Sequence, residues 1–327
     1  MSTLPASAEE FLRFLKSRDK RDSTIKRYKY DLADFNRFVE VTDHEHETNE
    51  LTLKNIEEYF HFLQTERRYK LRTLKRIQTV LAQYGAYLKS SGRLSSNPME
   101  GFHIEEAVHN ELEKEDLISP SEEKQLLDSI SSDAGLSVKQ QASRPLLAPR
   151  NIVLLRLFIK YGLRLQEVAY LRMKDVNLSQ KVILVPKDSG NGRKVLLSRK
   201  DQALIFQYLR AVPDAVRPKR DNDPLFVAFD FQRQTYRWSY ENDSPKMLTE
   251  VAIQKMIRQE LERAGVRKGL SAQHFRNTYI VNELTKGVPP EAVKEKLGLR
   301  TILTLTKYIQ YVEQAASSKN NSLTPYS

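Results

Sequence analysis

The residues with the clearest capacity for chemistry lie near the end of the chain, in the stretch QHFRNTYIVNELTKGVPPEAVKEKLGLRTILTLTKYIQY (residues 273–311). This stretch contains one histidine, several cations and three tyrosines, with a turn signal at Gly287 and Pro289 between two helical segments. Such residues can form a basic surface that grips a nucleic acid, or a site that also cuts it. The segment alone leaves both interpretations open.

The composition favours a polyanionic partner and excludes several kinds of site. The chain has 327 residues, with 53 Lys and Arg against 42 Asp and Glu, a net charge of +11 and a pI of about 9.5. It contains no cysteine, which excludes disulfides, thiol nucleophiles and Cys–zinc sites. The six histidines are scattered, and no apolar run reaches the ~18 residues of a membrane span. We therefore expect a cytoplasmic protein with no metal site and no membrane association.

Two clusters of cations near the N-terminus are candidates for phosphate contact. Residues 13–29 hold eight Lys and Arg against two Asp, and the stretch RRYKLRTLKR (residues 67–76) holds six cations in ten residues. A solvated helix face is the simpler explanation of either cluster, but the two together favour contact with a polyanion. The residues predicted to contact nucleic acid are Lys26, Arg27, Arg67, Arg68, Lys70, Arg72, Lys75 and Arg76.

The first hundred residues are predicted to form a helical domain. One helix starts at Asp22 or Ser23, and a second covers LTLKNIEEYFHFLQTE (residues 51–66). Residues 1–103 thus form the first domain, and the acidic, aperiodic residues 104–117 are interpreted as a linker. A third helix carries a buried stripe at steps of three and four residues, made of Leu74, Ile77, Leu81, Tyr84 and Leu88.

Residues 118–327 are predicted to form a second domain that mixes helices with a small sheet. Ser119 and Glu122 make a capping box at a helix start, with Pro120 at the first helical position. RNIVLLRLFIKYGLRLQEVAYLRMKDVNL is interpreted as two helices broken at Tyr161–Gly162, and KVILVPKDSGNGRKVLLS as a β-hairpin.

A further short strand is possible at DPLFVAF, and helices are expected over residues 251–264, 272–286, 290–297 and 303–316. The predicted fold class is therefore mainly α, with a helical domain followed by an α+β domain that contains a small antiparallel sheet.

Familiar catalytic motifs are absent from the sequence: there is no Walker loop, no Rossmann glycine pattern, no Gly-x-Ser-x-Gly and no metal-ligand spacing. Cations and tyrosines remain. Each candidate has an ordinary structural explanation, such as a surface ion pair, a solvated loop lysine or a packing tyrosine. Taken one at a time, each candidate residue is better explained by such a structural role than by a catalytic one. The candidates are Arg164, Lys187, Arg276 and Tyr308.

In combination, these residues resemble the tyrosine recombinase (phage-integrase) family, over most of the chain and in the family's order. YGLRLQEVAYLRMKDVNL is similar to the family's first box and supplies Arg164. VILVPKDSGNGRKVLL resembles the family's β-hairpin, whose lysine maps best to Lys187, with Lys194 as the alternative. STIKRYKYDLADFNRF is similar to the family's helical, SAM-like core-binding domain. With two domains, the chain resembles a simple recombinase of the Xer or transposon-resolvase type.

The C-terminal stretch carries the other half of the resemblance. QHFRNTYIVNELTKG is similar to the second box and supplies Arg276. EKLGLRTILTLTKYIQY is similar to the closing box, in which the tyrosine corresponds to Tyr308, with Tyr311 in reserve. The resemblance implies that Tyr308 attacks a DNA phosphodiester and forms a 3′-phosphotyrosyl link. It also implies that the two arginines stabilise the transition state and that Lys187 acts as general acid, without metal or cofactor.

Two positions depart from the family pattern. Where the second box usually has histidine, this chain has Gln273, which can donate a hydrogen bond but cannot shuttle a proton. Where the closing box usually has His or Trp, this chain has Leu299, which can only pack. The neighbouring His274 and Arg300 are candidates to take over these roles. Removing one preorganised donor costs ~10²–10³ in rate, so both losses together predict a slow enzyme.

The leading hypothesis is a site-specific recombinase that cleaves and rejoins double-stranded DNA at a recombination site and assembles as a homo-tetramer at synapsis. The alternative is a catalytically impaired relative that acts as a sequence-specific DNA-binding or architectural protein. An unrelated helical DNA-binding regulator is a third hypothesis, which the ordered boxes disfavour.

Overall fold

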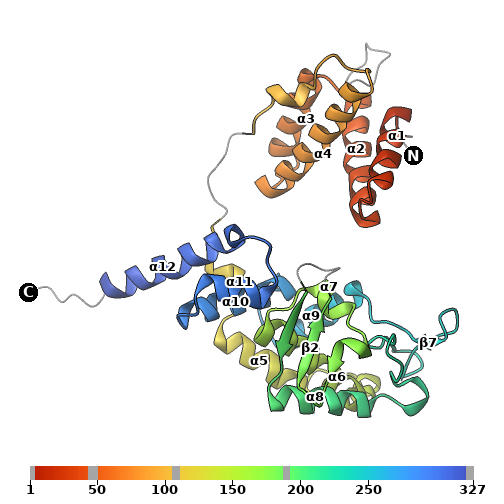
Figure 1. Cartoon of the computed structure of the whole chain (residues 1–327), viewed down its shortest axis with the longest axis vertical. Helices are drawn as coiled ribbons and strands as arrows, with labels where there is room; N and C mark the ends of the chain where they lie inside the picture. Colours follow the sequence, from red (N-terminus) through yellow and green to blue (C-terminus); the bar gives the residue numbers. More distant parts are fainter. Residues whose placement is uncertain (1–3, 43–50, 105–110, 187–191, 322–327) are drawn as a thin grey trace, which may run out of the picture. The chain divides into compact units, whose positions relative to one another are not determined.

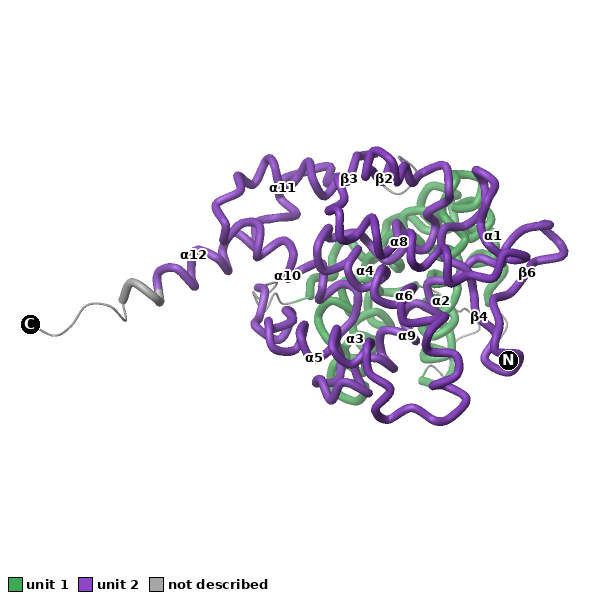
Figure 2. The backbone as a smooth tube through the Cα atoms, turned by 90° about the horizontal axis from the view of Figure 1, so that it is seen from below, with its two compact units in different colours: residues 1–109 green, residues 110–327 purple. Residues whose placement is uncertain are grey.

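The computed structural model describes residues 4–42, 51–104, 111–186 and 192–321, with side chains described as far as residue 317. The chain divides into two compact units, residues 1–109 and 110–327 (Figure 2). Each unit has its own buried apolar core.

Unit 1 is a bundle of helices, shown in red to orange in Figure 1. Thr52 caps α3 by accepting from the backbone N–H of Asn55, and the aromatic pair Tyr59 and Phe60 on α3 is almost completely buried. The core is therefore built from one face of each helix. The helices are α1 (Ala6–Ser17), α2 (Asp22–Thr42), α3 (Leu53–Thr65) and α4 (Leu71–Ser90), followed by the short 3₁₀ helix η1 (Pro98–Gly101).

Unit 2 is larger and carries the sheet. Its longest helix, α6, packs against α8 and α10, and α12 projects away from the rest of the unit (Figure 1). Its α-helices are α5 (Pro120–Ile130), α6 (Val138–Tyr161), α7 (Leu165–Ala169), α8 (Arg199–Ala211), α9 (Glu250–Arg263), α10 (Ala272–Thr285), α11 (Pro290–Leu297) and α12 (Thr306–Asn321). Its 3₁₀ helices are η2 (Lys114–Asp116), η3 (Met173–Asp175), η5 (Asp214–Val216) and η6 (Ile302–Leu305).

The main sheet of unit 2 is antiparallel, in the order β1-β2-β3, with Ile183 opposite Val195 and Val185 opposite Arg193. Side chains alternate between its faces, so Ile183, Val185 and Val195 are buried while Leu184 and Lys194 are exposed. The strands are β1 (Val176–Asn177), β2 (Val182–Val185) and β3 (Arg193–Leu196), and two small hairpins consist of β4 (Phe229–Asp230) with β5 (Thr235–Tyr236), and β6 (Trp238–Ser239) with β7 (Ser244–Pro245).

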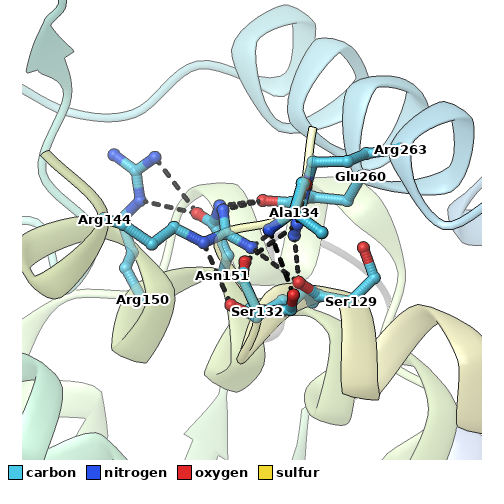
Figure 3. Close-up of polar contacts among 9 residues, drawn as sticks. Ser129, Ser132, Ala134, Arg144, Arg150, Asn151, Glu260 and Arg263 are labelled. Atoms are coloured by element: carbon cyan, nitrogen blue, oxygen red, sulfur yellow. Dashed lines mark hydrogen bonds and ion pairs between the residues drawn. The ribbon is translucent and has the colours of Figure 1, made fainter. Parts of the chain in front are cut away.

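A buried ionic network joins α6 to α9 (Figure 3). Glu260 accepts hydrogen bonds from Arg144 at 2.6 Å, Arg263 at 2.8 Å and Asn151 at 2.8 Å. Burial alone would raise the pKa of Glu260, but the two arginines hold it below its ordinary value. Arg263 also donates to the Ser132 carbonyl at 2.9 Å. The network therefore fixes α9 against the loop that follows α5.

The sequence predicted the main elements, and the structure corrects several details. The predicted capping box at Ser119 and Glu122 is present. Helix α1 was not predicted, although Phe11, Leu12 and Leu15 share its buried face. Helix α6 starts at Val138, well before the predicted segment, and contains two prolines.

Other corrections concern shorter segments. The helix predicted after Gly162 is only the five-residue α7, because η3 and β1 follow it and add a third strand to the predicted hairpin. Within DPLFVAF, only Phe229 belongs to a named strand, although Val227 bridges Met247. The last helix begins at Thr306, after the 3₁₀ turn η6.

The segment interpreted as a linker packs at both of its described ends. Ile104 is buried in the core of unit 1, and Leu112 is buried in an apolar cluster of unit 2. Residues 114–116 form η2.

The break after α6 depends on Gly162. This residue ends the helix in the left-handed conformation, with φ of 61°, and a Cβ there would lie 2.4 Å from Cδ1 of Tyr279. The turn delivers Arg164 to the N-cap of α7. A glycine is therefore required both by the backbone and by the close approach of α10.

We predict that Gly162→Ala lowers the free energy of unfolding by about 2–5 kcal/mol, because left-handed strain adds to overpacking against Tyr279. The control is Gly265→Ala, since Gly265 has φ of 66° but nothing within 4 Å of its Cβ position. That variant is expected to cost about 1–2 kcal/mol. Urea denaturation measures both, and equal losses would contradict the close-contact argument.

Candidate active site

Arg276 lies in the interior of unit 2, on α10. It is 4% exposed, and it donates to the backbone carbonyl of Gly162 and, at 3.4 Å, to that of Leu297. Burial, together with the positive charge of Arg164, lowers the pKa of Arg276 to about 9. Its Nη1 atom lies 4.0 Å from Oε2 of Glu167. Because this pKa is still well above neutral pH, the buried guanidinium remains charged and can bind an anion through its forked donors.

Arg164 reaches the same place from the N-cap of α7. Its Nη1 donates to Oε1 of Glu167 at 2.7 Å and lies 3.5 Å from the Leu297 carbonyl, which Arg276 also contacts. Its side chain is 35% exposed, so this guanidinium has access to solvent. The structure therefore brings the two sequence-predicted arginines together around one backbone oxygen.

Glu167 is the common acceptor of this arginine cluster. Its side chain is fully buried and accepts two hydrogen bonds from the guanidinium of Arg193, at 2.8 and 2.7 Å, and one from the backbone N–H of Arg164 at 2.8 Å. Burial alone would raise the pKa of Glu167, but Arg193 and the other donors hold it below its ordinary value. Three guanidinium groups thus surround one carboxylate.

Arg193 was not identified from the sequence. It occupies an inward position of β3, one alternation from the buried Val195, and its side chain is 5% exposed. Its Nε is the one buried side-chain nitrogen or oxygen without a hydrogen-bond partner in the part of the chain that the structure describes. The period-two pattern of the strand was the available signal, since a cation at an inward position requires a buried anion.

The candidate lysines differ in what the structure shows. Lys187, the preferred candidate, lies outside the described residues. Lys194 is exposed and lies next to Arg193 on β3, so its side chain points to the opposite face of the sheet from the carboxylate cluster. This geometry disfavours Lys194.

Tyr308 lies at the start of α12 and is only 4% exposed. Its hydroxyl donates to Oδ1 of Asn277 at 2.8 Å, and the ammonium of Lys307 lies 5.0 Å from the centre of its ring. Tyr308 belongs to the apolar cluster of unit 2 that also contains Leu112, and Tyr311, the reserve candidate, packs half-buried against this cluster. Leu299 is buried in this cluster too, so it contributes packing beside Tyr308.

The amide residues of α10 connect two of the candidates. Gln273 is exposed, and its Nε2 donates to Oδ1 of Asn277 at 2.8 Å, the same atom that accepts from Tyr308. Asn277 is 4% exposed and was not identified from the sequence. Its position one residue after Arg276 was the only available signal.

The two residues considered as replacements lie in different environments. His274 is half-buried and shares a hydrogen bond with the Ser271 hydroxyl at 2.9 Å, and burial lowers its pKa. Arg300 is exposed. His274 therefore already has a local partner, whereas the side chain of Arg300 is open to solvent.

The basic clusters of unit 1 contain more ion pairs than the sequence suggested. Arg76 and Arg27 both pair with Asp31, the latter at 3.8 Å, and Arg67 pairs with Asp34 at 2.5 Å. Together with Tyr30, Arg37 and Tyr69, they line a hollow between α2 and α4. The remaining predicted DNA contacts are exposed: Lys26, Arg68, Lys70, Arg72 and Lys75.

Known proteins allow the family to be assigned. Residues 118–314 match the model of the Phage integrase family, and residues 8–90 match the model described as Phage integrase, N-terminal SAM-like domain. The chain belongs to the phage integrase family. The resemblance and the mainly α fold predicted from the sequence are thereby confirmed.

Relatives extend this match over most of the chain. The chain is 24% identical to "Tyrosine recombinase XerD" of Listeria monocytogenes serovar 1/2a over 302 residues, which cover 92% of each chain. Such relatives are named tyrosine recombinases, and this chain is an enzyme of that class.

Solved structures show the same fold. The Tn1549 transposon integrase in complex with transposon right end DNA aligns with a TM-score of 0.66 and 17% identity, covering 97% of this chain and 99% of the integrase chain. XerH bound to a palindromic difH substrate aligns with a TM-score of 0.65 and 20% identity, covering 95% and 83%.

The described residues contain neither a metal site nor a membrane span. No group of His, Asp and Glu side chains there is arranged to hold a metal ion. No helix in the same residues is long and apolar enough to cross a membrane.

We predict that Glu167→Gln lowers the free energy of unfolding at pH 7 by about 3–5 kcal/mol, because it leaves buried guanidinium groups without their carboxylate. The folded-state pKa of Glu167 is depressed, so its contribution is present above the unfolded-state pKa of about 4.3 and is lost as the pH falls. Urea denaturation at pH 7 and at pH 4 measures this effect. The difference from wild type should shrink at acid pH.

The matched control for this prediction is Glu291→Gln, since Glu291 is exposed on α11. It should change stability by less than about 0.5 kcal/mol at either pH. A difference between wild type and Glu167→Gln that stays constant with pH would contradict the assignment of an ionised Glu167.

Proposed function

We propose that this enzyme is a site-specific recombinase that cuts DNA with Tyr308 and carries the cut strand on that residue. The observation that carries the proposal is the convergence of Arg164 and Arg276 on the carbonyl of Leu297, at 3.5 and 3.4 Å. These are long contacts to a neutral acceptor. The non-bridging oxygens of a phosphate would replace the carbonyl as a charged acceptor and form shorter, stronger bonds with both guanidinium groups.

The proposed chemistry needs no external energy source. The Tyr308 oxygen attacks the phosphorus, the bond from phosphorus to the 5′-oxygen breaks, and a 3′-phosphotyrosyl link forms. The phenol proton leaves to solvent or a nearby base, and the departing 5′-oxygen takes a proton, for which Lys187 is the proposed donor. Gln273 would add a neutral hydrogen bond to a phosphate oxygen. Attack by another 5′-hydroxyl reverses the steps and rejoins strands.

The roles of the two units follow from their charge. The exposed cations on α2 and α4 of unit 1 would contact the phosphates of the recombination site, while unit 2 binds the scissile phosphate. Asp31 and Asp34 would hold Arg27, Arg67 and Arg76 in defined positions before DNA arrives. DNA-bound relatives such as the Tn1549 integrase support a duplex DNA partner. A homo-tetramer at synapsis, acting in the cytoplasm, completes the proposal.

We predict that wild type forms a covalent complex that survives SDS when incubated with a nicked duplex carrying its recombination site. The site can be recovered by selecting bound sequences from random duplexes. Tyr308→Phe should abolish the adduct, because it removes the attacking oxygen, whereas Tyr311→Phe should retain it. Arg276→Lys should slow adduct formation by about 10²–10³-fold, because a lysine lacks the forked donor geometry.

Each other outcome has a distinct meaning. An adduct with Tyr308→Phe but none with Tyr311→Phe would move the nucleophile to Tyr311. Specific binding by wild type without any adduct would overturn strand cleavage and favour the DNA-binding or architectural alternative.

We also predict a steep salt dependence of DNA binding, since two units that hold a duplex neutralise many phosphates. Arg72→Ala should reduce the slope of log K against log salt by about 0.9, the value expected for one lost phosphate contact. Arg93→Ala is the matched control on unit 1, because Arg93 lies outside both basic clusters and pairs with Glu10 at 2.6 Å. Fluorescence anisotropy between 50 and 200 mM salt measures the slopes, and binding that hardly changes with salt would contradict the proposed interface.

A further inference from the structure

Asn277 makes an unusual set of hydrogen bonds at the candidate active site. Its Oδ1 accepts from the Tyr308 hydroxyl and from Nε2 of Gln273, each at 2.8 Å, and its Nδ2 donates to the backbone carbonyl of Asp116 at 3.1 Å. One buried amide thus contacts the proposed nucleophile, a proposed phosphate donor and the segment with which unit 2 begins.

The contact with Asp116 fixes which way the amide faces. A backbone carbonyl can only accept, so the atom of Asn277 that faces Asp116 must be the NH₂ group. The other end is then the oxygen, which can only accept. The Tyr308 hydroxyl therefore directs its proton toward Asn277, and Gln273 presents its NH₂ group to the same oxygen.

This arrangement is incompatible with attack on DNA. An amide oxygen is too weak a base to take the phenol proton, so the proton must leave by another route. With Tyr308 only 4% exposed, a DNA phosphate also has little access to its oxygen. In addition, one of the two N–H groups of the Gln273 amide is directed at Asn277 and not at a phosphate.

We propose that Asn277 is a positioning residue that holds Tyr308 and Gln273 in a resting arrangement, from which both must be released before strand cleavage. This inference rests on the proposed function of Tyr308. An arriving phosphate supplies a charged acceptor that draws Gln273 away from Asn277. The tyrosine is then held by its own bond to Asn277 alone, and a movement of α12 that breaks this bond carries its hydroxyl toward the arginines.

Removing the shared acceptor should make the enzyme less dependent on the complete substrate. With Asn277→Ala or Asn277→Leu, we expect covalent adduct to form about two- to tenfold faster on a nicked half-site, the change that corresponds to one net hydrogen bond. The dissociation constant for the half-site should stay within twofold of wild type, because Asn277 is buried and does not contact DNA. The leucine variant fills the space if the alanine variant does not fold.

Two control variants separate this role from a structural one. Asn277→Asp keeps an oxygen for Tyr308 but loses the donor to Asp116, so it should not accelerate adduct formation. Thr278→Val removes the 2.8 Å bond from the backbone N–H of Ile118 to the Thr278 hydroxyl, which loosens the same segment without touching Tyr308. It should also leave the rate unchanged.

The measurement is single-turnover adduct formation with saturating half-site DNA, with binding measured separately. Unchanged or slower rates for both Asn277→Ala and Asn277→Leu would overturn the proposal, as would equal acceleration by Asn277→Asp or Thr278→Val. Adding Tyr308→Phe to each variant tests separately whether Tyr308 is the nucleophile. An adduct that survives that substitution shows that Tyr308 is not the nucleophile, whatever Asn277 does.

Discussion

The candidate active site depends on a single buried carboxylate. Glu167 faces three guanidinium groups, those of Arg164, Arg193 and Arg276, and its own side chain has no exposure to solvent. Like charges at such separations repel strongly at low dielectric, and the lowered pKa of Arg276 reflects burial and that repulsion. The single carboxylate offsets part of this repulsion but does not neutralise the positive charge of the cluster. A bound phosphate would neutralise the remaining positive charge.

The backbone around this carboxylate positions the charged side chains of the cluster. Gly162 reverses the chain at the end of α6, so that Arg164 caps α7 and Glu167 follows one turn later. The strand β3 supplies Arg193, and α10 supplies Arg276 from the other side of the cluster. Successive residues on α10 point about 100° apart, so Arg276 faces the carboxylate while Asn277 faces Tyr308. One helix thus holds the anion ligand and the nucleophile's partner in adjacent positions.

Much of this could be predicted from the sequence because it is local. The capping box at Ser119, the break at Gly162 and the apolar stripe of α4 depend on residues within a few turns, and the structure contains all three. Arg193 and Asn277 were missed because their partners lie 26 and 31 residues away along the chain. Such pairings depend on strand register and helix packing. The same reason explains why Asp31, which pairs with Arg76 of α4, and Asp34, which pairs with Arg67 between α3 and α4, did not enter the interpretation of the basic clusters.

The central claim is that Tyr308 becomes linked to the 3′ end of a cut DNA strand held by the arginine cluster. Fragmentation mass spectrometry of the peptide that remains attached to DNA tests it most directly, since the peptide released after Lys307 contains both Tyr308 and Tyr311. The account predicts a nucleotide linked through its 3′-phosphate to Tyr308. A nucleotide on Tyr311, or a link through a 5′-phosphate, would contradict it.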